Sequence, residues 1–473
     1  MGQDPAQRNG GLMSQALKTP VLNALYARPG SESDARSLAT LVANTGMAQP
    51  VIEHLRFKPE TSAVARIVDA ARDRSGAASQ PWWFAAYAPS ETNKAGKLLK
   101  RADQTGYPLF TALLPDDPRT SVFCGPIGLD RMLFKALAEI KAVDSRGRVD
   151  GTVLSYNPWR RVVFKRTGDS GESSVVRVWA EPPATAPLLP ALHQLGAPVL
   201  PVTGMTQHSI EQPWITGGDF TERLAADVAA TGGAVSGVMT SDSGAAGDKV
   251  PGGSATGAAA TVALSPSDLL PAVAEAVTRL HNIDPAALVS MTQEVLHSGM
   301  PGALGQKLAV PGVNPVAALQ GAANGLTCFL ADLRGRFETV ADDVLRAIAE
   351  NPGAAVLSHG DLSADQVVLG EDGAPLLIDF DRMKMAPIGY DLGDFAAVEL
   401  LSGRDSSTAV ALAEAYRRVP GTGVVTDESV RAWTAFHVLL RVTEAFRNLD
   451  PDCVNHARQR VDLAHAVLRG KVE

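Results

Sequence analysis

The feature that most constrains the fold is a stretch from Thr231 to Thr261, which is rich in Gly, Ala and Ser and almost free of large apolar residues. Such a composition buries too little apolar surface to offset the entropy lost on ordering, so we expect a mobile linker or loop there. The stretch divides the 473-residue chain into two unlike halves. A chain of this length predicts two or three domains.

The first half is rich in strand signals. Runs of β-branched and aromatic residues separated by Gly-containing turns are typical of antiparallel strands. The predicted strands are Arg161–Lys165, Ser174–Trp179, Ala197–Val202 and one that ends in a turn at Pro213–Gly218, with a helix at Ala186–Leu195.

A faint internal echo also occurs in this half. The segment from Leu55 to Arg66 resembles the segment from Leu154 to Lys165, with Leu, an aromatic residue, Pro, Val and a basic residue at matching offsets. A polar turn and an apolar strand follow each copy, and in the first copy that strand is Trp82–Tyr87. Either a small antiparallel sheet has been duplicated, or two unrelated hairpins share a similar composition.

The second half is mostly helical by its pattern, with apolar residues at the spacing of a helix face. The predicted helices are Ser267–His281, Gly321–Ile348, Ala432–Phe446 and Asn455–Leu468. Between them, Val367–Leu369 and Pro375–Ile378 flank a Gly-containing turn, which predicts a β-hairpin.

Composition excludes several classes of function. A net charge of −8 argues against nucleic acid as a partner, because that would need a basic patch. Cys124, Cys328 and Cys453 lack the spacing of a zinc site or a disulfide framework, which fits a reducing cytosol. Neither a signal-peptide pattern nor a run of 18 apolar residues is present, so we expect a cytoplasmic protein without a membrane partner. The pattern leaves the oligomeric state open.

The chemistry is concentrated between His359 and Asp391. Asp361 precedes the predicted hairpin, Gln366 lies five residues further on, and Asp379 follows the second strand directly. Phosphoryl transfer needs a carboxylate to orient a hydroxyl group, and it needs oxygen ligands for Mg²⁺. A hairpin that carries these side chains at its two ends holds both on one rigid support.

The same residues carry a family resemblance. His359-Gly360-Asp361, the amide side chain of Gln366, Ile378-Asp379-Phe380 and Asp391-Leu392 are spaced as in the aminoglycoside phosphotransferase and choline kinase family. The resemblance implies an α+β, bilobal, protein-kinase-like fold with a small antiparallel β lobe and a mostly helical C-terminal lobe. The implied parts are an N-terminal extension or cap at residues 1–150, the small lobe at 151–220, a hinge-proximal region with the flexible insertion at 221–264, and the large lobe with the catalytic loop at 265–473.

Roles for these residues follow from the resemblance. It implies that Asp361 orients and deprotonates the substrate hydroxyl, that Gln366 and Asp379 bind Mg²⁺, and that ATP is the phosphoryl donor. His359 is implied to hold the loop, and Asp391 to cap its backbone amides. Gln366 stands where most of the family has Asn, as in maltokinases and related bacterial sugar kinases. This variation favours a sugar or amino-sugar acceptor; the competing interpretation is a loss of metal affinity.

Nucleotide anchoring departs from the family pattern. The hinge is expected near Trp214 and Ile215, where backbone groups meet adenine. Arg177 occupies the strand position at which the family has a phosphate-binding lysine, and arginine binds phosphate with a different geometry. Lys165 on the preceding strand is the alternative anchor, and Arg177 as a solvent-facing strand residue is the competing interpretation. The helix that follows offers no clear glutamate partner for Arg177.

The sequence therefore predicts an ATP- and Mg²⁺-dependent kinase that acts on a hydroxyl of a sugar, amino sugar or aminoglycoside. Carboxylates on the late helices suit an amine-bearing substrate, although each is also compatible with an ordinary surface charge. The candidate substrate residues are Asp381, Asp394, Glu399, Glu444 and Arg447. The alternatives are a non-catalytic pseudokinase with a regulatory role and an antibiotic-modifying enzyme.

Overall fold

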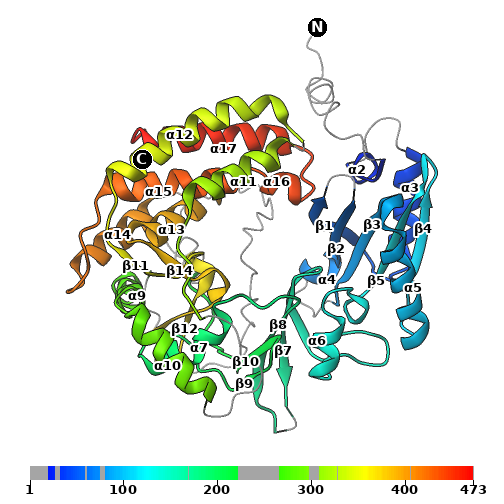
Figure 1. Ribbon diagram of the computed structural model, residues 1–473, viewed down its shortest axis with the longest axis horizontal. Helices are drawn as coiled ribbons and strands as arrows, with labels where there is room; N and C mark the ends of the chain where they lie inside the picture. The colour runs from blue at the N-terminus through cyan, green and yellow to red at the C-terminus, as the bar shows by residue number, and fades with distance from the viewer. Residues whose placement is uncertain are drawn as a thin grey trace. The chain divides into compact units, whose positions relative to one another are not determined.

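The computed structural model describes residues 20–26, 32–58, 61–74, 80–168, 170–221, 266–297, 308–327, 329–404 and 406–471. The Gly/Ala/Ser-rich stretch lies outside these residues. The chain divides into two compact units, each built from several segments. Figure 1 colours the chain by residue number, from blue at the N-terminus to red at the C-terminus. The first unit takes residues 1–181, 323–334 and 443–457, and the second takes residues 182–322, 335–442 and 458–473.

A five-stranded antiparallel sheet occupies the N-terminal part of the first unit, with strand order β1-β2-β3-β5-β4. Its central strand β3 is buried along almost its whole length, because its residues Trp82–Tyr87 are apolar on both faces. The strands are β1 (Pro50–Lys58), β2 (Ser62–Asp69), β3 (Trp82–Tyr87), β4 (Phe110–Leu114) and β5 (Asp117–Pro126). Helices α3 (Glu32–Ala43) and α5 (Thr92–Thr105) pack against this sheet.

A second antiparallel meander follows in the same unit, formed by β6 (Thr152–Asn157), β7 (Arg161–Thr167) and β8 (Ser173–Trp179). Its register repeats that of the first meander. Phe57 pairs with Ala63 as Tyr156 pairs with Val162, and both first hairpins carry a register shift at the matching place. The turn bonds also match, since Ala88 N donates to Thr61 O and Ala180 N donates to Arg160 O. The structure therefore contains the repeat that the sequence echo suggests.

The two meanders share one hydrophobic core but differ at the position of Arg177, the proposed phosphate anchor. Trp83 and Tyr87 of the first meander belong to the same buried cluster as Phe164 and Val178 of the second. In the repeat, Val64 pairs with Ala85 where Val163 pairs with Arg177. The first meander thus keeps the backbone of the second without a basic residue at the Arg177 position.

Asp130 fastens the second meander to the loop after β5. The carboxylate is fully buried and accepts hydrogen bonds from Tyr156 Oη, Trp159 N, Met132 N and Leu133 N. A buried carboxylate is stable only when it is satisfied in this way. Residues before and after position 150 therefore form one packed body in this unit.

The second unit contains the predicted catalytic segment. β12 (Val367–Leu369) and β13 (Pro375–Leu377) form the predicted hairpin, and β11 (Ala355–Ser358) pairs with β14 (Lys384–Pro387). The hairpin of β9 (Gly204–Met205) and β10 (Ser209–Pro213) also lies here. The principal helices around these strands are α7 (Leu189–Gln194), α9 (Pro266–His281), α10 (Pro285–His297), α13 (Gly389–Leu401), α14 (Ser407–Arg418) and α15 (Asp427–Leu440).

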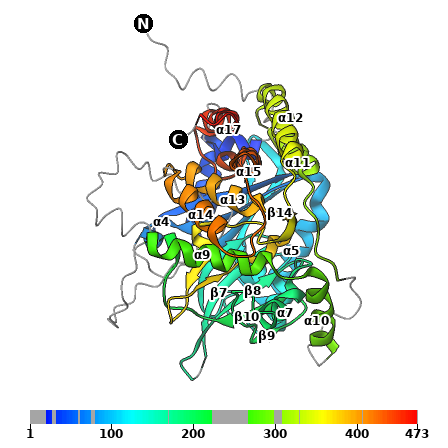
Figure 2. The same ribbon diagram turned by 90° about the vertical axis from the view of Figure 1, so that its left-hand side faces the viewer.

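Helix α13 is the centre of this unit and is buried over most of its length. It packs closely on α15, since a Cβ atom at Gly393 would lie 2.5 Å from Cβ of Trp433. Figure 2 shows α9 beside α14, in agreement with their packing. The first turn of α13 carries Asp391, so this packing fixes the position of a predicted site residue.

Three predicted elements were wrong in their extent. The Gly321–Ile348 segment is broken into α11 (Pro315–Thr327) and α12 (Arg334–Glu350), because the chain turns between them to bury Phe329 and Leu330. The helix predicted to run to Phe446 is also broken, into α15 and α16 (Glu444–Arg447). Ala197–Val202 forms a single bridge from Val199 to Leu377 rather than a strand, since two of its residues are prolines and lack N–H donors.

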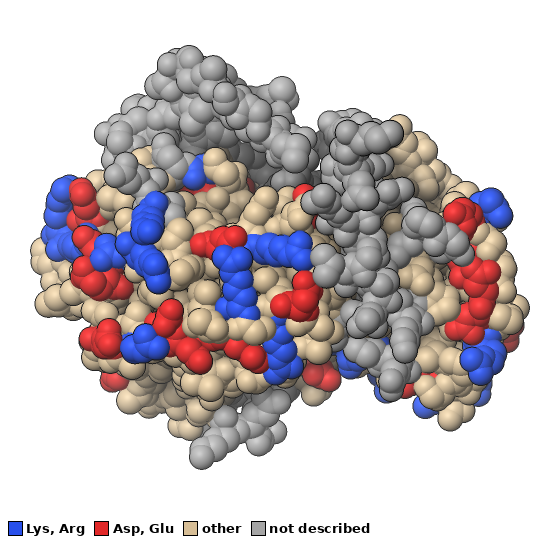
Figure 3. Space-filling view, turned by 90° about the horizontal axis from the view of Figure 1, so that it is seen from above, with Lys and Arg blue, Asp and Glu red and all other residues tan. Residues whose placement is uncertain are grey.

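The last predicted helix is present as α17 (Cys453–Leu468). No helix within the described part of the chain is both long and apolar enough to cross a membrane. Figure 3 shows acidic and basic side chains interspersed on the face in view, a distribution typical of ordinary solubility charge.

Candidate active site

The loop that carries Asp361 is held by Asp391. The Asp391 carboxylate accepts hydrogen bonds from His359 N at 2.7 Å and from Gly360 N at 2.9 Å. Gly360 has φ +85°, and a Cβ atom there would lie 2.0 Å from the Arg382 carbonyl oxygen. Only glycine fits this position, so the turn that precedes Asp361 depends on it. The capping role expected for Asp391 agrees with this geometry.

Asp391 is in turn held by a histidine that the sequence analysis did not single out. His281 Nε2 lies 3.0 Å from Asp391 Oδ2, and His281 Nδ1 lies 2.7 Å from the Tyr416 hydroxyl. Burial alone would raise the pKa of Asp391, but the hydrogen bond and charge of His281 together with the Gly360 amide lower it. The carboxylate therefore stays ionised inside the protein.

His359 connects the loop to the end of the hairpin. Its Nε2 atom lies 2.6 Å from the Ile378 carbonyl oxygen, and its ring packs on Phe380 at a centroid distance of 4.7 Å. The side chain is fully buried. These contacts agree with a role in holding the loop and give His359 no exposed edge for a substrate.

The hairpin brings the two proposed metal ligands together. Ile378 N donates to Gln366 O at 3.0 Å, and Asp379 is the next residue along the chain. Asp379 has left-handed backbone angles of φ 64° and ψ 58°. Strained angles of this kind cluster at functional sites, and Asp tolerates them better than most residues. Both side chains are more than nine-tenths buried.

Gln366 carries a buried acceptor without a partner. Its Nε2 atom donates to Asp365 Oδ2 at 3.3 Å, whereas its Oε1 atom has no hydrogen bond. A buried carboxamide oxygen of this kind, on the residue directly before the strand that pairs with the one preceding Asp379, fits a hard cation such as Mg²⁺. The described residues contain no cluster of three or more His, Cys, Asp or Glu suited to a metal. Mg²⁺ in kinases needs fewer protein ligands, since water and phosphate oxygens complete its shell.

Asp361 lies among cationic groups. Its Oδ1 atom is 2.9 Å from Arg382 Nη1 and 3.6 Å from Arg441 Nη2. Lys384 is close enough to feel the Asp361 charge, and burial followed by the nearby Arg382 lowers the pKa of Lys384. The carboxylate expected to orient the hydroxyl is therefore itself fixed by two guanidinium groups.

Asp394 belongs to the same network. Its carboxylate lies 2.8 Å from Arg441 Nη2 and 3.1 Å from His437 Nδ1. Burial alone would raise the pKa of Asp394, but Arg441 and His437 lower it well below its usual range. Arg441 thus joins Asp394 to Asp361.

The expected hinge segment runs alongside the hairpin. Asp219 bridges to Val368, and Leu369 N donates to Gly218 O at 3.2 Å. A Cβ atom at Gly217 would lie 2.3 Å from the Leu369 carbonyl oxygen, so the close approach requires glycine. Trp214 and Ile215 are half-buried and precede this anchored stretch.

Two further predicted residues lie in the second unit. Asp381 is half-buried in the turn after Asp379, and buried Glu399 forms a bidentate ion pair with Arg404, at 2.7 Å for each bond.

The other predicted residues lie in the first unit. Arg177 on β8 is only 8% exposed, so the interpretation of Arg177 as a solvent-facing residue was wrong, and Lys165 on β7 is half-buried. Both belong to the first unit, as do Glu444 and Arg447 on α16. The residues that the structure brings together are Asp361, Gln366, Asp379, Asp391 and Asp394.

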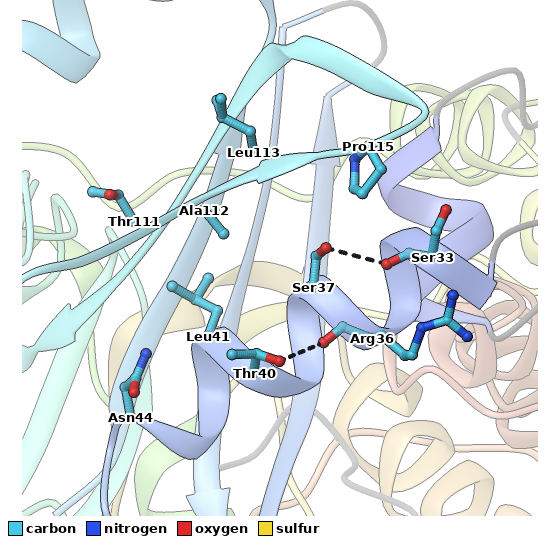
Figure 4. A pocket seen from close by; sticks show the side chains of 10 residues that line it. All are labelled: Ser33, Arg36, Ser37, Thr40, Leu41, Asn44, Thr111, Ala112, Leu113 and Pro115. Atoms are coloured by element: carbon cyan, nitrogen blue, oxygen red, sulfur yellow. Dashed lines mark hydrogen bonds between the residues drawn. The ribbon is translucent and has the colours of Figure 1, made fainter.

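A separate pocket of about 430 Å³ lies in the first unit (Figure 4). Helix α3 forms one wall with small polar side chains, and strand β4 forms the other. Two of these side chains, Ser37 and Thr40, donate to carbonyl oxygens of their own helix. The pocket is built around the N-terminal sheet, apart from the residues of the catalytic loop.

A family comparison decides the classification. The model of the phosphotransferase enzyme family, which includes the aminoglycoside phosphotransferases, matches residues 160–433, more than half of the chain. The chain belongs to this family. The match confirms the resemblance drawn from the motif and identifies the protein as a phosphotransferase of the kinase type. No curated protein matches the chain.

The solved structures that resemble this phosphotransferase are distant from it in sequence. A choline/ethanolamine kinase family protein from Mesorhizobium loti is 15% identical with a TM-score of 0.44, covering 71% of this chain and 95% of that one. An ethanolamine kinase from Plasmodium vivax is 11% identical with a TM-score of 0.42, covering 68% and 84%. A spectinomycin phosphotransferase solved with ADP and spectinomycin is 11% identical with a TM-score of 0.40, covering 71% and 98%.

The expected fold class is also confirmed, since antiparallel sheets are combined with a mainly helical C-terminal part. Sequence reasoning missed Asp365, His281 and Arg441. His281 ends a predicted helix and Arg441 lies inside another, so neither differed in pattern from a helix residue. Asp365 did carry a signal, because a carboxylate adjoining Gln366 adds charge to the proposed metal site.

Proposed function

We propose that this phosphotransferase moves the γ-phosphoryl group of ATP to a hydroxyl group of a neutral sugar or polyol, in the presence of Mg²⁺. The observation that carries the proposal is the hairpin with Gln366 and Asp379 at one end, beside the loop that presents Asp361. The family match supports the reaction class. The unpartnered Oε1 atom of Gln366 supports the use of a metal ion.

In this proposal each candidate residue has a separate role in phosphoryl transfer. Asp361 accepts a hydrogen bond from the acceptor hydroxyl, orients its oxygen toward the phosphoryl group and takes its proton as the new bond forms. Asp379 and Gln366 hold Mg²⁺, which when bound neutralises charge on the phosphate oxygens. Arg382 is half exposed beside Asp361 and is placed to stabilise charge on the transferred group. Trp214 and Ile215 are the proposed contacts for adenine, with Arg177 or Lys165 as the phosphate anchor.

The charges around Asp361 favour a neutral acceptor over an amine. Asp394 is already paired with Arg441, and Glu399 with Arg404, so neither carboxylate is available to a cationic substrate. Arg382, Arg441 and Lys384 add positive charge beside the base. A cationic aminoglycoside would meet repulsion there.

Release of ADP from ATP and Mg²⁺ across a panel of sugars, polyols, amino sugars and aminoglycosides tests the proposal. We expect turnover with a neutral sugar or polyol, and a loss of at least about 100-fold in kcat for Asp361→Asn, the usual size for a positioned base. Glu371→Gln, at an exposed position of the hairpin turn, is the matched control. Metal-dependent nucleotide binding without turnover of any acceptor would instead indicate a non-catalytic binding protein.

A further inference from the structure

Asp365 adjoins the proposed metal ligand Gln366, and each of its two carboxylate oxygens accepts a hydrogen bond. Ser363 Oγ donates to Asp365 Oδ1 at 2.5 Å, and Gln366 Nε2 donates to Asp365 Oδ2 at 3.3 Å. Ser363 lies directly before the short 3₁₀ turn η5 (Ala364–Gln366) and is itself buried. A chain of two hydrogen bonds therefore runs from the Ser363 hydroxyl through the Asp365 carboxylate to the amide of Gln366.

This chain determines which way the Gln366 amide faces. Because Nε2 is bound to Asp365, Oε1 must point to the opposite side of the amide group. That oxygen is in a side chain only 1% exposed and has no hydrogen-bond partner. An unsatisfied buried acceptor costs about 1–3 kcal/mol, so its retention points to a ligand that it binds.

Burial raises the pKa of the Asp365 carboxyl, and the charges of Asp361 and Asp379 add to this effect. Arg404 offsets part of the repulsion, as Arg382 and Arg441 do at Asp361. The observation that points to a cation is therefore the geometry of the Gln366 amide, whose nitrogen is bonded and whose oxygen is not.

We propose that Asp365 is a positioning residue for the metal ligand Gln366. Glutamine has one more rotatable bond than asparagine and would lose more freedom on coordination; Asp365 removes that freedom in advance by fixing the amide with its oxygen toward the metal. Outer partners of this kind typically change metal affinity by about 10–100-fold when removed. The proposal rests on the function proposed above, because it assumes the Gln366–Asp379 metal site.

Calorimetric titration of ADP with and without Mg²⁺ tests this role without relying on turnover. The quantity of interest is the gain in ADP affinity that Mg²⁺ provides. We expect Asp365→Asn and Asp365→Ala to lower this gain about 10-fold or more while metal-free ADP affinity stays unchanged. Asp365→Asn is the sharper variant, since its NH₂ group can bond Gln366 Oε1 and so turn the amide around. The positioning role predicts an equal or higher unfolding midpoint in these variants, because they remove a buried charge, whereas a purely structural role predicts a lower midpoint with the Mg²⁺-dependent gain unchanged.

A double-mutant cycle separates positioning from the simple loss of a negative charge. In a Gln366→Ala background, Asp365→Ala should have little further effect on the Mg²⁺-dependent gain, because there is no amide left to position. Additive losses would overturn the proposal in favour of a long-range charge effect. An unchanged gain in the Asp365 variants would overturn it outright. If the unmodified protein shows no gain with Mg²⁺, the proposed function itself fails, which is a distinguishable outcome.

Discussion

The Nε2 atom of His281 lies 3.0 Å from Oδ2 of Asp391, and both side chains are almost completely excluded from solvent. His281 belongs to α9 and Asp391 to α13, so a contact between two helices supports the backbone of the catalytic loop. The loop geometry is therefore a property of the helical core as well as of its own sequence.

Replacing Asp391 should destabilise the protein. Asp391→Asn leaves one of the loop amides, His359 N or Gly360 N, without an acceptor and weakens the bond to His281. We expect a loss of about 3–5 kcal/mol in the free energy of unfolding, the usual result of breaking a buried pair. Urea unfolding followed by circular dichroism measures it. Glu371→Gln should change the value by less than about 0.5 kcal/mol; equal stability of the two variants would contradict the anchoring role.

Arg441 should affect both stability and turnover. Arg441→Met leaves the Asp394 carboxylate buried with reduced compensation and removes a cation near Asp361. We expect a loss of about 3–5 kcal/mol in the free energy of unfolding together with a lower kcat. Combining it with Asp394→Asn should restore most of the stability and little of the kcat. Full recovery of kcat in the double variant would limit Arg441 to neutralising Asp394.

The packed core of the first unit predicts the effect of Tyr156→Phe. The variant removes the hydrogen bond of 2.8 Å to the buried Asp130 carboxylate. Trp159 N still donates to the same oxygen, so the loss is one hydrogen bond to a charged group, about 1.5–3 kcal/mol, and differential scanning calorimetry should show a lower Tm. Lys97→Gln on the exposed face of α5 serves as the control.

A chain that begins at residue 151 should aggregate, because β6–β8 would lose the core that they share with the first sheet. A soluble, folded product would contradict the shared core.

His54 predicts a specific dependence of stability on pH. It lies in the bulge of β1, where burial and then the charges of Arg66 and Arg447 lower its pKa to about 3. The unfolded chain takes up the proton near pH 6.5, so this contribution to stability is complete above 6.5 and is lost as the pH falls toward 3. His54→Asn, which suits the positive φ of 54°, should flatten the plot of unfolding free energy against pH.

The size of that change follows from linkage. One extra proton bound by the unfolded chain corresponds to a slope of about 1.4 kcal/mol per pH unit, and the variant should lack up to this amount between pH 4 and 6. Urea unfolding at a series of pH values gives both slopes. Parallel slopes would show that His54 is protonated in the folded protein.

The sequence predicted the parts of this protein that rest on local pattern. The hairpin around Gly373, the strand Trp82–Tyr87 and the helix ending at His281 lie where alternation, turn residues and helical spacing placed them. The sequence singled out Asp361, Gln366 and Asp379 as candidate site residues because they have fixed spacings along one segment. Family membership followed from the same spacing.

The remainder depends on contacts between distant segments. The pairing of Arg441 with Asp394 and of His281 with Asp391 joins residues far apart in the chain, and no spacing rule reports it. The break after Thr327 has the same cause, because burial of Phe329 and Leu330 outweighs the helical pattern. Glu399 is different, because its partner Arg404 lies only five residues away in the sequence. This ion pair could have been predicted from the sequence, and it was overlooked when Glu399 was considered as a substrate residue.

The two similar meanders allow a comparison of equivalent positions within one molecule. Strand register, the bulge and the turn bond are the same in both copies, whereas Arg177 in one corresponds to Ala85 in the other. What both copies retain is what the polypeptide needs in order to fold; what differs is open to selection for binding. Comparing the two meanders of one chain can therefore separate positions that strand pairing requires from positions that can serve ligand binding, without an alignment of relatives.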